Sequence, residues 1–142
     1  MNDKTIPEIF FKREGRLNRW RYFKRNVVLG IISSFIMVVI ELFFGNINEN
    51  ISTTGNVLLF VAMMLILVPS YCLVVRRLHD MDRDELLAKV YIAGCAASYF
   101  LSFVLKYDFM PLSVVMVIVA LYILFVPGTY GTNKYGADPL NN

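Results

Sequence analysis

The sequence predicts an all-α membrane protein: a four-transmembrane-helix bundle with both termini in the cytoplasm. Hydrophobic residues make up 57% of the chain, whereas a soluble domain is usually about 45–50% apolar. Four apolar segments approach the roughly 20 residues that cross a ~30 Å hydrocarbon core. They are residues 27–44, 57–75, 86–105 and 112–126. The third observation is that lysine and arginine gather on one side of these segments.

The chain divides into three regions on this interpretation. Residues 1–26 form a basic and aromatic cytoplasmic segment at the membrane interface, residues 27–126 form the four-span bundle, and residues 127–142 form a Gly/Asn-rich cytoplasmic tail. The apolar segments are expected to be helices because lipid cannot hydrogen-bond to free backbone groups.

The composition of the N-terminal segment is mostly explained by an ordinary basic and aromatic anchor where the chain enters the membrane; the alternative is an amphipathic helix on an anionic leaflet. The segment contains an apolar set that can share one helical face, namely Ile6, Phe10, Leu17 and Trp20. Gly15 is expected to break this helix. Asn18 is then well placed to cap the helix that continues into the first span.

The distribution of basic residues predicts the topology. Eight of the 14 lysines and arginines precede the first span, three lie in residues 76–85, and Lys134 lies in the tail. The opposite side holds only Lys106, while Lys89 falls inside the third span. Because cytoplasmic loops carry the excess of basic residues, we expect a multi-pass membrane protein with both ends in the cytoplasm.

The last two spans are expected to form an antiparallel hairpin. Residues 106–110 leave room only for a tight connection, and Pro111 suits the first turn of the fourth helix. Cys72 and Cys95 both fall inside apolar spans, where thiols usually act as small buried hydrophobes.

Three polar clusters fall at the cytoplasmic ends of the spans. They occupy residues 15–23, 76–83 and 128–139. The first contains Arg16 and Arg19, and the second contains the run Arg76-Arg77-Leu78-His79-Asp80. The third combines spaced glycines with Asn133 and Asp138. If the bundle brings these ends together, several guanidinium groups meet at headgroup depth.

Together the three clusters resemble the signature of the domain of unknown function 805 family, small bacterial inner-membrane proteins. The residues that match are Gly15, Arg16, Arg19, Tyr22, Phe23, the whole run from Arg76 to Asp80, Gly128, Gly131, Asn133, Tyr135, Gly136, Asp138 and Pro139. The chain departs from the pattern at Arg21, where the family often has an acidic residue, and after Arg83. The resemblance implies an inner-membrane location but no activity, substrate or cofactor.

The clusters allow two roles. Arginine forks suit phosphate and carboxylate, so the face could bind anionic lipid or a small anionic ligand. Alternatively, the arginines pair internally with Asp80, Asp82 and Asp138 and clamp the loops to the bundle. The candidate residues for either role are Arg16, Arg19, Arg76, Arg77, His79, Asp80, Asn133 and Asp138.

We therefore expect a non-enzymatic membrane protein whose cytoplasmic face binds anionic phospholipid or a partner protein. The alternative is a small oligomeric transporter or channel, although the spans hold few polar residues. A lipid-modifying enzyme using His79 and Asp80 is a third, weaker hypothesis. No cofactor, metal site or nucleic-acid partner is expected, because one histidine is little for a zinc or iron site and the basic residues are explained by membrane orientation.

Overall fold

The computed structural model describes residues 5–45 and 52–140, and the regular elements within them are all helices. They are α1 (Ile6–Phe10), α2 (Arg19–Phe44), α3 (Thr53–Asp80), α4 (Leu86–Tyr99), the π-helix η1 (Phe100–Val104) that continues α4, and α5 (Met110–Phe125). Predictions that fall on Lys4, on residues 46–51 of the first connection or on the last two residues lie outside the described residues.

Three of these helices are long and apolar enough to cross a membrane. They are α2 with 26 residues, α3 with 28, and the continuous helix Leu86–Val104 with 19. The last helix, α5, has 16 residues, which at about 1.5 Å per residue makes it ~24 Å long. It begins with Pro111 in its first turn, as the sequence predicts. The structure thus contains three candidate spans and one shorter apolar helix.

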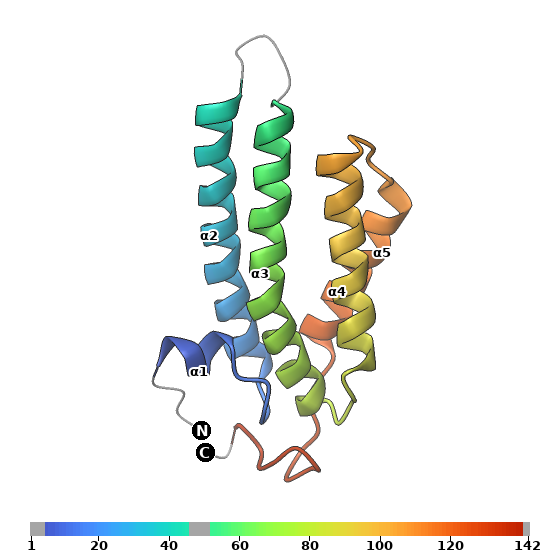
Figure 1. Ribbon diagram of the computed structural model, residues 1–142. Coiled ribbons are helices and arrows are strands. Elements are labelled where there is room, and N and C mark those ends of the chain that lie inside the picture. The colour runs from blue at the N-terminus through green and yellow to red at the C-terminus, as the bar shows by residue number, and fades with distance from the viewer. Residues whose placement is uncertain (1–4, 46–51, 141–142) are drawn as a thin grey trace.

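Figure 1 shows that consecutive long helices run in opposite directions. Helix α2 packs along α3, α3 contacts α4, and α5 packs on α4 and also reaches α2. The beginning of α2, the end of α3 and the C-terminal tail all lie at one end of the bundle, with α1 beside α3 (Figure 1). The three polar clusters of the sequence therefore share one end of the molecule, here called the tail end.

The start of α2 is as predicted, but the amphipathic helix before it is not. Asn18 caps α2, because its side-chain oxygen accepts a hydrogen bond from the Arg21 N–H at 2.9 Å. Gly15 has φ of 81° and turns the chain. The predicted shared helical face is wrong, since α1 ends at Phe10 and Leu17 is buried in a loop. The reason is that the Leu17 N–H donates to the Arg76 carbonyl at 3.0 Å, which docks this loop on α3.

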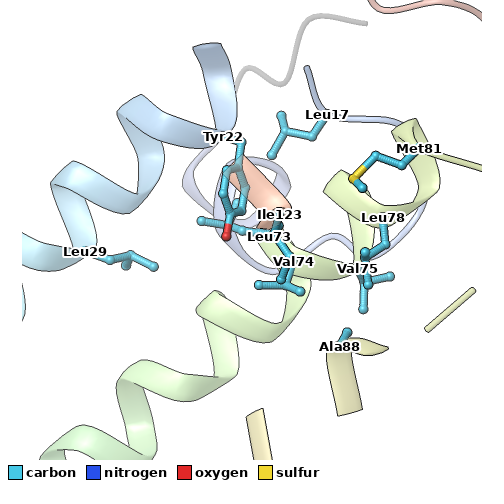
Figure 2. Packing of buried hydrophobic residues seen from close by; sticks show 10 residues of the cluster. All are labelled: Leu17, Tyr22, Leu29, Leu73, Val74, Val75, Leu78, Met81, Ala88 and Ile123. Atoms are coloured by element: carbon cyan, nitrogen blue, oxygen red, sulfur yellow. The ribbon is translucent and has the colours of Figure 1, made fainter. Parts of the chain in front are cut away.

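The apolar core lies mainly at the tail end. Figure 2 shows its side chains converging from the N-terminal loop, α2, α3, α4 and α5. Residues 72–81 of α3 and its cap are buried without interruption, so this stretch is enclosed on every side rather than along one face. Farther along the helices, large apolar side chains such as Phe35, Leu42 and Leu65 are exposed. That arrangement is typical of helices that face lipid, whose tails are as apolar as the side chains.

Candidate functional site

A buried carboxylate with two arginines stands at the centre of the tail end. Asp80 is the last residue of α3, and its Oδ1 accepts from Arg16 Nε at 3.1 Å. Its Oδ2 accepts from Arg77 Nη1 at 2.5 Å. The three side chains are 5% exposed or less. Because removing charges from water is costly unless they are paired and hydrogen-bonded, the remaining donors of both arginines must also find acceptors.

Arg16 finds its other acceptors in the tail. Its Nη1 donates to the Gly131 carbonyl and its Nη2 to the Thr129 carbonyl, both at 2.5 Å. A guanidinium carries five N–H donors in a fixed planar fork, so one side chain can reach α3 and the tail together. Arg16 consequently joins the N-terminal loop, α3 and the tail.

Arg77 finds its other acceptors at the end of α5. Its Nε donates to the Ile123 carbonyl at 3.0 Å, and its Nη2 donates to the Val126 carbonyl. The last carbonyls of a helix lack partners within the helix and carry partial negative charge. Arg77 therefore caps α5 and ties it to α3.

The tail also touches the backbone of Asp80. The Thr129 N–H donates to the Asp80 carbonyl at 2.8 Å. At the preceding position, a Cβ built on Gly128 would lie 2.2 Å from Asp80 Oδ2. Only glycine allows the tail to approach this closely.

His79 and Asn133 hold the far part of the tail. The His79 ring stacks on Tyr135 with centroids 3.8 Å apart, and its Nδ1 lies 3.4 Å from the Gly15 carbonyl. Asn133 Nδ2 donates to the His79 carbonyl at 2.9 Å, while Asn133 Oδ1 accepts from the Tyr135 N–H. These contacts fix the tail across the end of α3.

Asp138 shapes the tail through backbone hydrogen bonds. Its carboxylate accepts from the Leu140 N–H at 2.9 Å and from the Gly131 N–H at 3.1 Å. These two bonds lower the pKa of the Asp138 carboxyl, because they stabilise its charged form.

The other two arginines behave differently from each other. Arg76 is buried, and its Nη1 donates to the Glu8 carbonyl of α1 at 3.1 Å. Arg19 is exposed at the start of α2, where its Nη1 lies 3.4 Å from the Phe125 carbonyl. Of the four arginines expected at this face, Arg19 is the one whose side chain remains open to the surroundings.

The convergence expected from the sequence is present in the structure, and so is an ion pair between Arg77 and Asp80. Asp82, in contrast, is exposed and takes no part in the ion pairs of Asp80 with Arg16 and Arg77. Sequence reasoning did not identify the carbonyl acceptors of Thr129, Ile123 and Val126, because every residue carries a carbonyl. It also missed the stacking of Tyr135 on His79, for which an aromatic residue in the tail is a weak signal.

The described part of the chain contains no group of three or more His, Cys, Asp and Glu side chains placed to hold a metal ion. Neither the curated proteins nor the solved structures include a match to this chain. A family model described as "Protein of unknown function (DUF805)" matches residues 10–137, from before the first polar cluster to within the third. The chain therefore belongs to the DUF805 family of proteins of unknown function.

Proposed function

We propose that this chain is a non-enzymatic multi-pass protein of the bacterial inner membrane, with four spans and both termini in the cytoplasm. Three helices have spanning length, and the alternating directions in Figure 1 return the chain to the tail end after α5. Helix α5 is a few ångströms short of a typical hydrocarbon core, a mismatch that local bilayer thinning accommodates. Twelve of the 14 basic residues belong to the segments of the tail end, which the positive-inside rule places in the cytoplasm.

Two exposed tyrosines at opposite ends of the bundle test this topology. Tyr130 in the tail is 92% exposed, and Tyr107 between η1 and α5 is 59% exposed. In a variant with Cys72→Ser and Cys95→Ser, we expect Tyr107→Cys to react with an impermeant maleimide in intact spheroplasts. Tyr130→Cys should react only after the membrane is opened. The reverse pattern would overturn the cytoplasmic placement of the tail, and labelling of both cysteines in intact spheroplasts would overturn the fourth span.

The function we propose for the tail end is binding to an anionic phospholipid surface. The observation that carries it is the basic and aromatic start of α2, which points outward. Trp20 is 62% exposed and stacks on Phe23 at 5.8 Å, and Lys24 Nζ lies 5.0 Å from the Trp20 ring. Exposed apolar residues follow from Val27 onward. Such a belt suits the headgroup layer, where each basic residue contributes about 1 kcal/mol near an anionic leaflet.

The basic residues of the tail end fall into two groups with different roles. Arg16, Arg76 and Arg77 are buried and hydrogen-bonded inside the protein, which supports the internal-clamp role for these three. The basic residues of the N-terminal region outside this cluster remain for lipid. Lys24, which is exposed, and Lys12, which is half-buried, represent them, since no ion pair holds either side chain among the described residues.

Melting in nanodiscs of phosphatidylglycerol and of phosphatidylcholine separates these roles. We expect the wild type to melt higher in the anionic bilayer. Lys12→Gln with Lys24→Gln should shrink that difference, whereas Arg76→Gln with Arg77→Gln should lower the melting temperature in both bilayers and leave the difference intact. Equal melting of the wild type in both bilayers would refute anionic-surface binding.

A further inference from the structure

Two hollows meet at Arg19 and Trp20. The first is a pocket of about 220 Å³ between the start of α2 and the tail, lined by both charged and apolar side chains, and many times the ~10–15 Å³ that one water needs. Its lining includes Asp80, Tyr130 and Asp138. The second is an apolar groove between α2 and α5, whose lining adds Phe23, Leu124 and Phe125. Because both linings contain Arg19 and Trp20, the pocket and the apolar groove adjoin each other.

From the groove into the pocket, the lining is first apolar, then positively charged and then negatively charged. The groove opens on the exposed rings of Phe23 and Phe125, where the apolar surface of the helices begins. Arg19 marks the border, with Nη1 3.4 Å from the Phe125 carbonyl. Asp138 lines the pocket but not the groove, so its carboxylate belongs to the other side of that border. An acyl chain, a phosphate and a positively charged headgroup terminus follow one another in the same order in an aminophospholipid.

Outside the buried arginine–aspartate cluster, the pocket lining offers one cation and one anion, which favours a ligand that carries both charges. Its ionisable side chains are two arginines and two aspartates: Arg19, Arg77, Asp80 and Asp138. Arg77 and Asp80 belong to the buried cluster that Arg16 also joins from outside the pocket lining. Arg19 and Asp138 remain, one suited to a phosphate and the other to an ammonium group.

The Asp138 carboxylate can still accept hydrogen bonds from an ammonium group. Each of its two oxygens accepts one backbone N–H, and a carboxylate oxygen has a second lone pair. The exposed rings of Trp20 and Tyr130 at the rim would attract a cation further.

We propose that the pocket and groove together seat one phospholipid whose headgroup carries a primary ammonium beyond its phosphate. Arg19 binds the phosphate, Asp138 accepts from the ammonium, and one acyl chain lies in the groove between α2 and α5. The proposal rests on the membrane orientation proposed above. It is independent of the anionic-surface preference, because it concerns one bound molecule rather than the surrounding bilayer.

Native mass spectrometry of the delipidated full-length protein tests this phospholipid-binding site. The probes are phosphatidylethanolamine, phosphatidylcholine and phosphatidylglycerol with identical acyl chains. We expect one phosphatidylethanolamine to be retained about tenfold better than either competitor, since only its headgroup offers ammonium N–H donors. Glycerophosphoethanolamine, which lacks acyl chains, should not be retained. Equal retention of the three lipids, preference for phosphatidylglycerol, or retention of the chain-free headgroup would refute the proposed phospholipid-binding site.

Two substitutions then test the assigned residues. Arg19→Gln should reduce retention of all three lipids, while Arg83→Gln, an exposed arginine of the α3–α4 turn, should change nothing. Asp138→Asn should abolish the preference for phosphatidylethanolamine over phosphatidylcholine. Melting of each variant shows that it is folded. If Arg19→Gln and Arg83→Gln behave alike, or if folded Asp138→Asn keeps the preference, the assignment is wrong. If these lipid-retention tests fail while the wild type still melts higher in phosphatidylglycerol nanodiscs, the anionic-surface proposal is not affected.

Discussion

Replacing Asp80 by asparagine is expected to destabilise the protein by about 3–5 kcal/mol. The change keeps the shape of the side chain but removes the single negative charge that faces both Arg16 and Arg77. Those guanidiniums retain their carbonyl acceptors. The variant therefore loses mainly the negative charge that compensates two buried positive charges. Breaking a buried ion pair from one side costs about 3–5 kcal/mol, a large part of a typical stability of ~5–15 kcal/mol.

The free energy of unfolding of Asp80→Asn, measured by titrating mixed micelles with sodium dodecyl sulfate, checks this value. Asp82→Asn is the matched control, because it removes the same charge two residues away at an exposed position. Asparagine also tolerates the φ of 55° found there. A loss of less than ~1 kcal/mol for Asp80→Asn, or equal losses for the two variants, would refute the view that the cluster holds this end together.

Three further predictions concern the same end. Gly128→Ala should cost about 1–3 kcal/mol of unfolding free energy in the same titration, because its Cβ would lie 2.2 Å from an oxygen of the Asp80 carboxylate that two arginines hold in place. Asn18→Ala should cost about 1 kcal/mol and speed hydrogen exchange at the Arg21 amide, whose cap it removes. The pKa of Asp138 is lowered in the folded protein, so its stabilisation is present above the unfolded pKa of ~3.9 and is lost as pH falls through the folded pKa. Proteolysis of the tail should therefore increase below about pH 4, and Asp138→Asn should remove that pH dependence.

The sequence was sufficient to predict the helices because their signals are local. Apolar runs marked α2, α3 and the α4–η1 helix, Pro111 marked the start of α5, and Asn18 marked the start of α2. The convergence of the three polar clusters followed from topology alone, since each cluster adjoins the same end of a span. The π-helical turn at Phe100–Val104 had no local signal, because its residues would also suit an α-helix.

The partner of each arginine could not be derived in the same way. Arg76 and Arg77 are neighbours of the same residue type, so the sequence does not distinguish their roles. The helix nevertheless directs one toward Glu8 of α1 and the other toward Ile123 of α5. Successive positions on a helix point about 100° apart, so their surroundings depend on which elements pack on each side. The failure of the amphipathic prediction has a similar cause, because the burial of Leu17 is decided by the docking of its loop on α3.

The order of the contacts suggests why two arginines can share one buried carboxylate. Arg77 and Asp80 lie three residues apart on α3, and side chains at this spacing are neighbours on a helix. Their pair can therefore form as soon as α3 is helical, before any other segment docks. The segments that arrive later then meet a nearly neutral site. Arg16 brings the second positive charge together with the N-terminal loop, and the tail supplies carbonyl oxygens rather than charges to it. In this order the charge of Arg16 is buried only where Asp80 and the tail carbonyls already accept its N–H groups, which reduces the cost of removing that charge from water.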